Sequence, residues 1–98
     1  MDSRVCEILK VIGDPSRYKI LDHLLTEPRN VSEIIRAVGL QQSLVSHHLK
    51  ILRKHGILKA MRDGPFIRYA MNSPEVKSIF ELAESIAKKN SHKGDDNG

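Results

Sequence analysis

Residues 30–56 read NVSEIIRAVGLQQSLVSHHLKILRKHG, and this stretch decides the fold. Asn30 and Glu33 have the spacing of a capping box, which predicts that a helix begins here. Gly39 ends that helix in a tight turn, and a second helix is predicted over residues 42–54. Two short helices around a glycine-containing turn are typical of a helix-turn-helix motif.

Two stretches of alternating apolar and polar residues, 57–62 and 66–71, follow this motif. They are joined by Asp63-Gly64-Pro65, which predicts a β-hairpin with Pro65 at the turn or at a strand edge. A hairpin directly after the second helix of a helix-turn-helix motif is a wing that lies beside it.

Further helices flank this unit on both sides. Apolar residues at helical spacing predict a helix over residues 3–12, and Asp14-Pro15 opens the next helix as N-cap and first-turn proline. Ser73-Pro74-Glu75 opens the last one. The sequence therefore predicts a mainly α domain over residues 1–89 with one small β-hairpin, in the order α-α-α-α-β-β-α of a winged helix-turn-helix. Residues 90–98 are predicted to form a disordered tail.

Charge is unevenly distributed along the chain. The net charge is +4, and no acid lies between Glu33 and Asp63. A stretch of one sign within a folded domain is expected of a phosphate-binding face, although a solvated basic surface without a partner would have the same composition. The cations in this stretch are Arg36, Lys50, Arg53, Lys54, Lys59 and Arg62.

The helix predicted over residues 42–54 has two distinct faces. On a helical wheel, Val45, His48, Leu49 and Leu52 share one face and are expected to pack on the core. The opposite face has hydrogen-bonding side chains near the helix start, suited to base edges in the major groove, and cations near its end, suited to phosphates. Double-stranded DNA is therefore the expected partner of Gln42, Ser43, Ser46, His47, Lys50, Arg53 and Lys54, with Arg62 and Arg68 added from the wing.

Several motifs also resemble the ArsR-type repressors in order and spacing, over roughly residues 5–85. They are Gly13-Asp14-Pro15-Ser16-Arg17, Val38-Gly39-Leu40, Val45-Ser46-His47-His48-Leu49-Lys50 and Gly56-Ile57-Leu58. The resemblance implies a homodimer paired through its first and last helices. It also implies a repressor that leaves its operator when it meets an inducer, whose identity the residues do not give.

The terminal helices independently favour such a dimer, because each has an apolar stripe that a small monomer covers with difficulty. Burial within the monomer core is the alternative. The stripes are formed by Val5, Ile8, Leu9 and Ile12 in the first helix and by Val76, Ile79, Phe80 and Ala83 in the last.

The metal ligands of that family are not found here. Members that sense metals carry a Cys-x-Cys set where this chain has Asn30-Val31-Ser32-Glu33, and others use histidines of the last helix, where residues 73–89 contain none. Neither a metal nor another cofactor is expected, because the histidines of the chain lack ligand spacing. Cys6, the single cysteine, could form a disulfide across a dimer axis and act as a redox switch, but buried filler is its default role.

Other classes of function fit the sequence less well. The chain has no apolar run long enough to cross a membrane and no signal-peptide pattern at its start, so a cytoplasmic location is expected. It also lacks a nucleophile–base pair, a phosphate loop and clustered carboxylates, so an enzyme is not expected. The alternatives that remain are a winged-helix protein-interaction module and a thiol- or metal-responsive sensor with a non-standard site.

Overall fold

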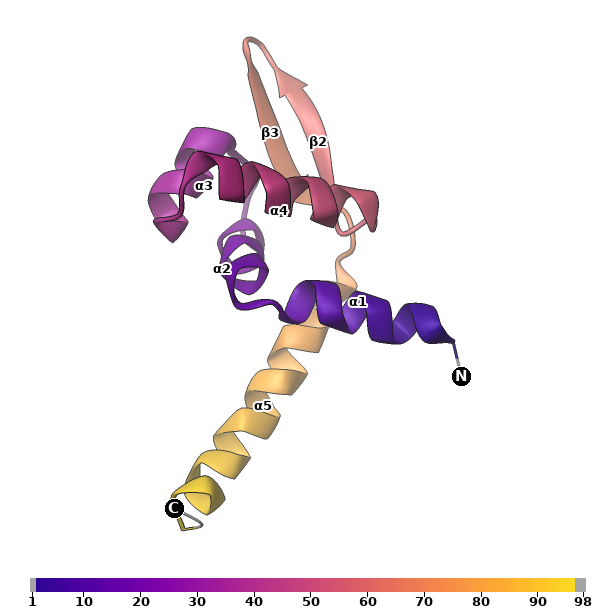
Figure 1. Cartoon of the computed structure of the whole chain (residues 1–98), viewed down its shortest axis with the longest axis vertical. Coiled ribbons are helices and arrows are strands. Elements are labelled where there is room, and N and C mark those ends of the chain that lie inside the picture. The colour runs from indigo at the N-terminus through magenta and orange to yellow at the C-terminus, as the bar shows by residue number, and fades with distance from the viewer. Residues whose placement is uncertain (1, 97–98) are drawn as a thin grey trace.

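The computed structural model describes residues 2–96, with side chains as far as Asn90. It confirms the predicted winged helix-turn-helix order and adds one short strand (Figure 1). The elements are α1 (Ser3–Gly13), α2 (Pro15–Leu24), β1 (Arg29–Asn30), α3 (Val31–Val38), α4 (Gln42–Lys54), β2 (Leu58–Asp63), β3 (Phe66–Met71) and α5 (Glu75–Asp96).

The residues predicted to cap α2 and α3 form the expected hydrogen bonds with the first turns of these helices. Asp14 accepts from the backbone N–H groups of Ser16 and Arg17 at 3.0 and 3.1 Å, which caps α2. At the start of α3, Asn30 and Glu33 each accept the other's backbone N–H at 2.9 Å, which is the reciprocal capping box. These caps fix where α2 and α3 begin.

The turn between α3 and α4 depends on Gly39. Its φ of +69° lies in the left-handed region, which costs glycine little because it has no Cβ. Its N–H donates to the carbonyl of Ile35 at 2.9 Å and ends α3. The chain can therefore reverse within three residues and start α4 across the core.

The core lies between α2, α3 and α4. The largest fully buried side chains come mainly from these three helices and interdigitate at their crossing. They are Ile20, Leu21, Leu24, Ile34, Val45, Leu49, Leu52 and, from α5, Val76.

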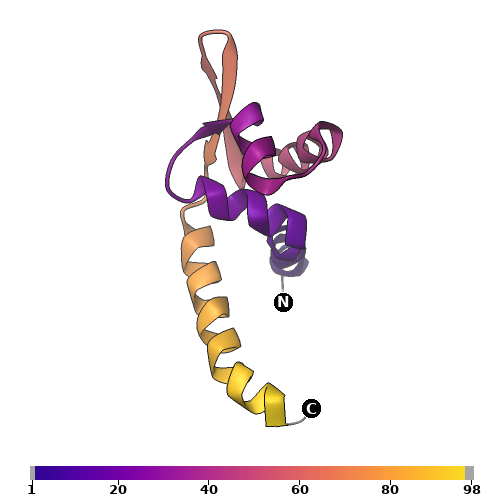
Figure 2. The ribbon, with the colours of Figure 1, turned by 90° about the vertical axis from the view of Figure 1, so that its left-hand side faces the viewer.

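The wing is a three-stranded antiparallel sheet in the order β1-β3-β2. In the hairpin, Asp63 pairs with Phe66, so only Gly64 and Pro65 form the turn and Asp63 is the last residue of β2. A positive φ at Gly64, +61°, fits the type II′ turn, whose first central position favours glycine. Figure 2 shows this hairpin projecting beyond the helices at one end of the molecule, with α5 at the other.

Helix α5 leaves the body of the domain and extends away from it (Figures 1 and 2). Its first turns stay attached through buried Val76 and through the edge-to-face contact of the Phe80 and Tyr18 rings, whose centroids are 4.8 Å apart. The helix continues to Asp96, past the predicted end at residue 89. The side chains of residues 91–98, which make up most of the predicted disordered tail, lie outside the described residues. The disorder of the tail therefore stays a prediction. Within the described part of the chain, no helix combines the length and apolarity that crossing a membrane requires.

Candidate nucleic-acid interface

The outer face of α4 is open to solvent along its whole length. Its inner face is buried as predicted, through Val45, His48, Leu49 and Leu52. Because one side of α4 is fixed in the core, the orientation of the other side is fixed as well. All seven α4 side chains that the sequence assigned to DNA are exposed: Gln42, Ser43, Ser46, His47, Lys50, Arg53 and Lys54.

His48 anchors α4 to α2 by a polar contact inside the core. Its Nδ1 accepts from Arg17 Nη1 at 3.3 Å, and Arg17 Nε also donates to the carbonyl of Val11 at 2.6 Å. Burial lowers the pKa of His48, against the opposing effect of the Asp14 carboxylate. The side chain is thus a hydrogen-bonded interior histidine on the inner face of α4, where the helical wheel places it, and His47 beside it on the helix is exposed to solvent.

The C-terminal end of α4 is tied to α1. His55, its C-cap, lies within hydrogen-bond distance of the carbonyl of Ile51 (Nδ1, 3.0 Å) and of Glu7 Oε1 (Nε2, 2.8 Å). Both partners are acceptors, so both ring nitrogens donate when the ring is protonated. The Ile51 carbonyl and then the Glu7 carboxylate raise the pKa of His55. This clasp joins the end of α4 to the first terminal helix, α1.

A pH-dependent contribution to stability follows from this clasp. A histidine whose pKa is raised on folding stabilises the protein fully below its unfolded pKa, near 6.5, and loses that stabilisation as pH rises through the higher folded value. We expect Glu7→Gln to lower the free energy of unfolding by up to about 1 kcal/mol at pH 6, since Glu7 is exposed, and by progressively less towards pH 8.5. Denaturant melts of both proteins across this range measure the difference.

Glu84→Gln is the matched control, because Glu84 forms an ion pair with a lysine, Lys88, on the surface of α5. Its effect should not change between pH 6 and 8.5. A Glu7→Gln effect that is equally constant with pH would contradict the clasp.

The wing presents fewer available cations than its sequence indicates. Arg62 is exposed near the tip. The Nε atom of Arg68, by contrast, lies 3.0 Å from Asp63 Oδ2, so an acid of the same hairpin already neutralises it. Arg62 is therefore the stronger of the two predicted wing contacts.

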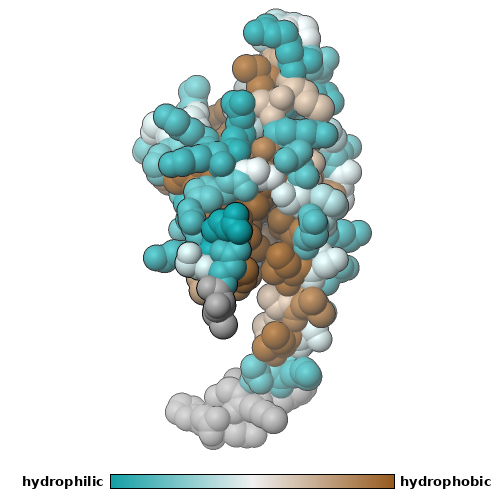
Figure 3. Space-filling model, turned by 90° about the vertical axis from the view of Figure 1, so that its right-hand side faces the viewer, coloured by the Kyte–Doolittle hydropathy of each residue, from teal (hydrophilic) through white to brown (hydrophobic). Residues whose placement is uncertain are grey.

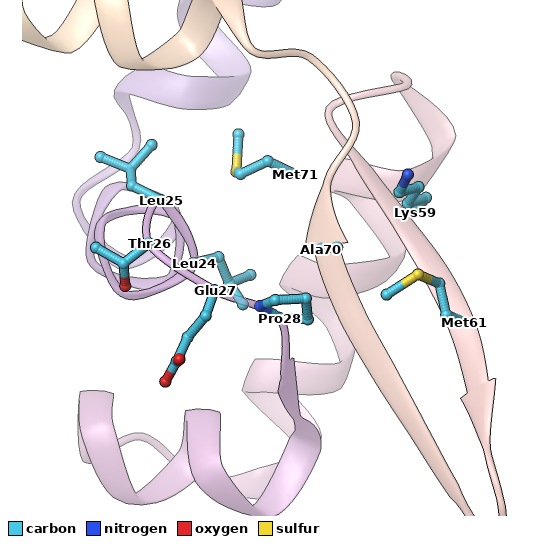
Figure 4. A pocket seen from close by; sticks show the side chains of 9 residues that line it. All are labelled: Leu24, Leu25, Thr26, Glu27, Pro28, Lys59, Met61, Ala70 and Met71. Carbon is cyan, nitrogen blue, oxygen red and sulfur yellow. The ribbon is translucent and has the colours of Figure 1, made fainter.

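A cleft separates α4 from the sheet, and we call it the α4–β3 cleft. It has a volume of about 500 Å³ and is lined by Ser46, Lys50, Arg53 and Lys54 of α4 and by Tyr69 of β3. Sequence reasoning did not place Tyr69 in the interface, because only the register of β3 brings it beside α4. A smaller hollow of about 340 Å³ lies between the end of α2 and the sheet, and its lining is largely apolar, including Leu25, Pro28, Met61 and Met71 (Figure 4).

The predicted dimer stripes divide into buried and exposed residues. Ile12 and Val76 are each 2% exposed and belong to the core of the monomer, while Ile8, Ile79 and Phe80 are partly buried against it. Val5, Leu9 and Ala83 remain exposed.

The exposed stripe also includes residues that the sequence did not assign to it. Leu82 is 67% and Ile86 57% exposed on α5, and Figure 3 shows apolar surface along this part of the molecule. Cys6 is exposed on α1, on the surface of the chain rather than in its core. Among the residues whose side chains are described, no cluster of histidine, cysteine or acid groups could hold a metal ion.

A fixed helix with a polar and basic outer face, beside a projecting hairpin, defines a winged helix-turn-helix DNA-binding protein. Residues 14–65 match the family model described as bacterial regulatory protein, arsR family. The chain belongs to this family, and it is a DNA-binding transcriptional regulator, as the sequence predicted.

Known proteins agree with this assignment. The transcriptional repressor PagR of Bacillus anthracis is 40% identical over 81 residues, which are 82% of this chain and 81% of PagR. The crystal structure of Rv0081 from Mycobacterium tuberculosis superposes with a TM-score of 0.85 at 28% identity, covering 93% of this chain and 92% of that one. The winged helix-turn-helix domain of Mb0332 from Mycobacterium bovis, a homodimer in solution, has a TM-score of 0.81 at 26% identity, with coverage of 93% and 84%.

Proposed function

We propose that this protein is a transcriptional repressor that binds a near-palindromic operator as a homodimer. The observation that carries the proposal is the acid-free, exposed face of α4, held in place by a buried inner face. In a symmetric dimer, two copies of α4 enter successive major grooves about 34 Å apart. A dimer bound in this way over a promoter blocks access of the polymerase.

The residues of α4 divide between reading sequence and holding the backbone. Gln42 can bond adenine bidentately, and Ser43, Ser46 and His47 offer donors and acceptors to base edges. Lys50, Arg53 and Lys54 come from the second half of the helix and bind phosphates without reading sequence. Arg62 adds a phosphate contact from the wing.

Support for the dimer comes from the exposed apolar residues of α1 and α5 and from the homodimeric state of Mb0332. Support for repression comes from the similarity to PagR, which is named a transcriptional repressor. The familiar ligand motifs for metals are missing from α3 and from the part of α5 before residue 90.

Selection of bound sequences from random duplex DNA tests the proposal, followed by binding of the selected duplex to two variants. His47→Ala should change the preferred sequence at one or two positions, with about tenfold less discrimination against the wrong base. Lys54→Ala should weaken binding to all sequences alike, by about fivefold, because a phosphate contact carries no sequence information.

Lys89→Ala is the matched control for Lys54→Ala, since Lys89 is an exposed cation in the second half of α5. Helix α5 extends away from the wing (Figure 2). This variant should bind DNA like the wild type. If selection enriches no sequence, or if His47→Ala and Lys54→Ala lose affinity equally for every sequence, the assignment of α4 as the reading helix is wrong.

A further inference from the structure

The α4–β3 cleft has an unusual lining for a hollow on a protein surface. It contains three cations and two hydroxyl groups and no carboxylate. Within the described part of the chain, none of its five side chains forms a hydrogen bond or ion pair with another residue. Elsewhere in the chain, cations such as Arg29 and Arg68 are paired with nearby acids. The cations and hydroxyl groups of the cleft are therefore available to bind an anionic ligand.

Tyr69 differs from the other residues of the cleft in how firmly it is held. Its strand β3 is the central strand of the sheet, where Tyr69 pairs with Arg29 of β1 on one side and with Ala60 of β2 on the other. Its ring packs against the hydrophobic core and is half-buried. A lysine on a helix surface, by comparison, has a flexible four-carbon stem. Tyr69 is thus the one donor of the cleft whose position the sheet and the core determine.

The location of the cleft indicates which anion it receives. The cleft lies between the outer face of α4 and the base of the wing, and Ser46, which lines it, belongs to the face that we assign to the major groove. When α4 enters that groove, the strand at the groove's edge must pass between α4 and the wing. That strand carries one phosphodiester per nucleotide, with a negative charge and several acceptor oxygens.

We propose that the α4–β3 cleft holds a phosphodiester of the DNA backbone, with the hydroxyl of Tyr69 donating to a phosphate oxygen. Lys50, Arg53 and Lys54 neutralise the charge, and Tyr69 sets the depth and register at which α4 meets the bases. Tyr69 is therefore a positioning residue that reads no sequence itself. This inference rests on the proposed function. It adds a contact between DNA and an uncharged, firmly held side chain, Tyr69, which the distribution of charge along the sequence does not indicate.

The salt dependence of binding separates a neutral donor from a cation. A lysine that contacts a phosphate releases counterions when it binds. Removing the lysine therefore makes the negative slope of log K against log salt less steep, by about one per protomer. A tyrosine hydroxyl releases none. We expect Tyr69→Phe to weaken binding to random-sequence duplex DNA by about tenfold, as for one hydrogen bond to a charged group, and to leave the slope unchanged. Lys54→Gln should make the slope less steep.

Tyr18→Phe is the matched control, because Tyr18 carries an exposed ring on α2, against α5 and remote from the cleft. It should bind DNA like the wild type, and thermal melts of both variants should confirm that they fold. If Tyr69→Phe binds duplex within twofold of the wild type while Lys54→Gln is weakened, the Tyr69 contact is wrong and DNA binding stands. If the wild type itself ignores duplex DNA, the proposed function fails first.

The source of the phosphate is a separate arm of the same experiment. Titration of the wild type and Tyr69→Phe with inorganic phosphate, followed by NMR shifts of α4 and β3 amides, measures binding of a free anion. We expect this binding of inorganic phosphate to be weak at most. Tight phosphate binding that Tyr69→Phe abolishes, without any effect of that variant on duplex DNA, would assign the cleft to a free anion and overturn the proposal.

Discussion

The affinity for duplex DNA is expected to fall by about ten-thousandfold when salt rises from 50 to 200 mM. Each protomer has four exposed cations on the proposed DNA side, and none of them has an acid partner among the residues whose side chains are described. They are Lys50, Arg53, Lys54 and Arg62. Eight such contacts in a dimer give a slope of log K against log salt of roughly −7, because each neutralised phosphate releases about 0.9 counterion. Fluorescence anisotropy with a labelled duplex at five or six salt concentrations measures this slope.

A matched pair of variants ties the slope to this surface. Arg62→Gln should make it less steep by about two per dimer, from roughly −7 to roughly −5. Lys89→Gln, which removes a distant cation of α5, should leave it unchanged. Arg68→Gln should have a smaller effect than Arg62→Gln, because Asp63 already neutralises Arg68. A wild-type slope between 0 and −2 would mean that the basic stretch is a solvated surface, and it would favour a protein-interaction module.

The buried and the exposed face of α4 could both be predicted from the sequence, because the spacing of its apolar residues determines which side chains point inward and which point outward. Val45, Leu49 and Leu52 recur at intervals of four and three residues, so burying them fixes the outward direction of Ser46 and Lys50. The caps were predictable for a similar reason, since the side chain that satisfies a helix end lies within three residues of it in the chain.

Features that depend on residues distant in the chain were not predictable. Strand β1, only Arg29 and Asn30, is too short to show alternation and exists because β3 offers it a free edge. Tyr69 enters the cleft through strand register, which periodicity does not determine. For the terminal helices, a helical wheel shows which face is apolar, but it does not show which of the apolar residues are buried within the monomer. Ile12 and Val76 are buried within the monomer, whereas Leu82 is exposed.

The exposed apolar residues of α1 and α5 give the second large expected effect. Leu9 of α1 and Leu82 of α5 are 50% and 67% exposed, and Val5 and Ile86 add further exposed apolar surface to the same two helices. Such a surface on a small protein indicates a place where another chain packs. Placing carboxylates at both positions, by Leu9→Asp together with Leu82→Asp, would bury two unpaired charges in each half of the dimer, and the dimer should dissociate.

Loss of the dimer should lower affinity for a duplex with two half-sites by about two to three orders of magnitude. Two linked binding modules gain that much because the second binds at a high effective concentration once the first is bound. A single half-site, by contrast, should bind the double variant and the wild type with similar affinity per protomer, since α4 and the wing are unchanged. Sedimentation equilibrium and anisotropy on the two duplexes measure both quantities.

Leu9→Met with Leu82→Met is the matched control, because it keeps the apolar surface at both positions. This variant should stay dimeric and bind the two-site duplex like the wild type. Unfolding of the Asp variant would be seen as loss of helical circular dichroism, and it is not expected because neither leucine is buried in the monomer. A folded Asp variant that remains dimeric would show that α1 and α5 do not form the interface. A monomeric variant that keeps full affinity for the two-site duplex would show instead that the protein binds DNA without pairing.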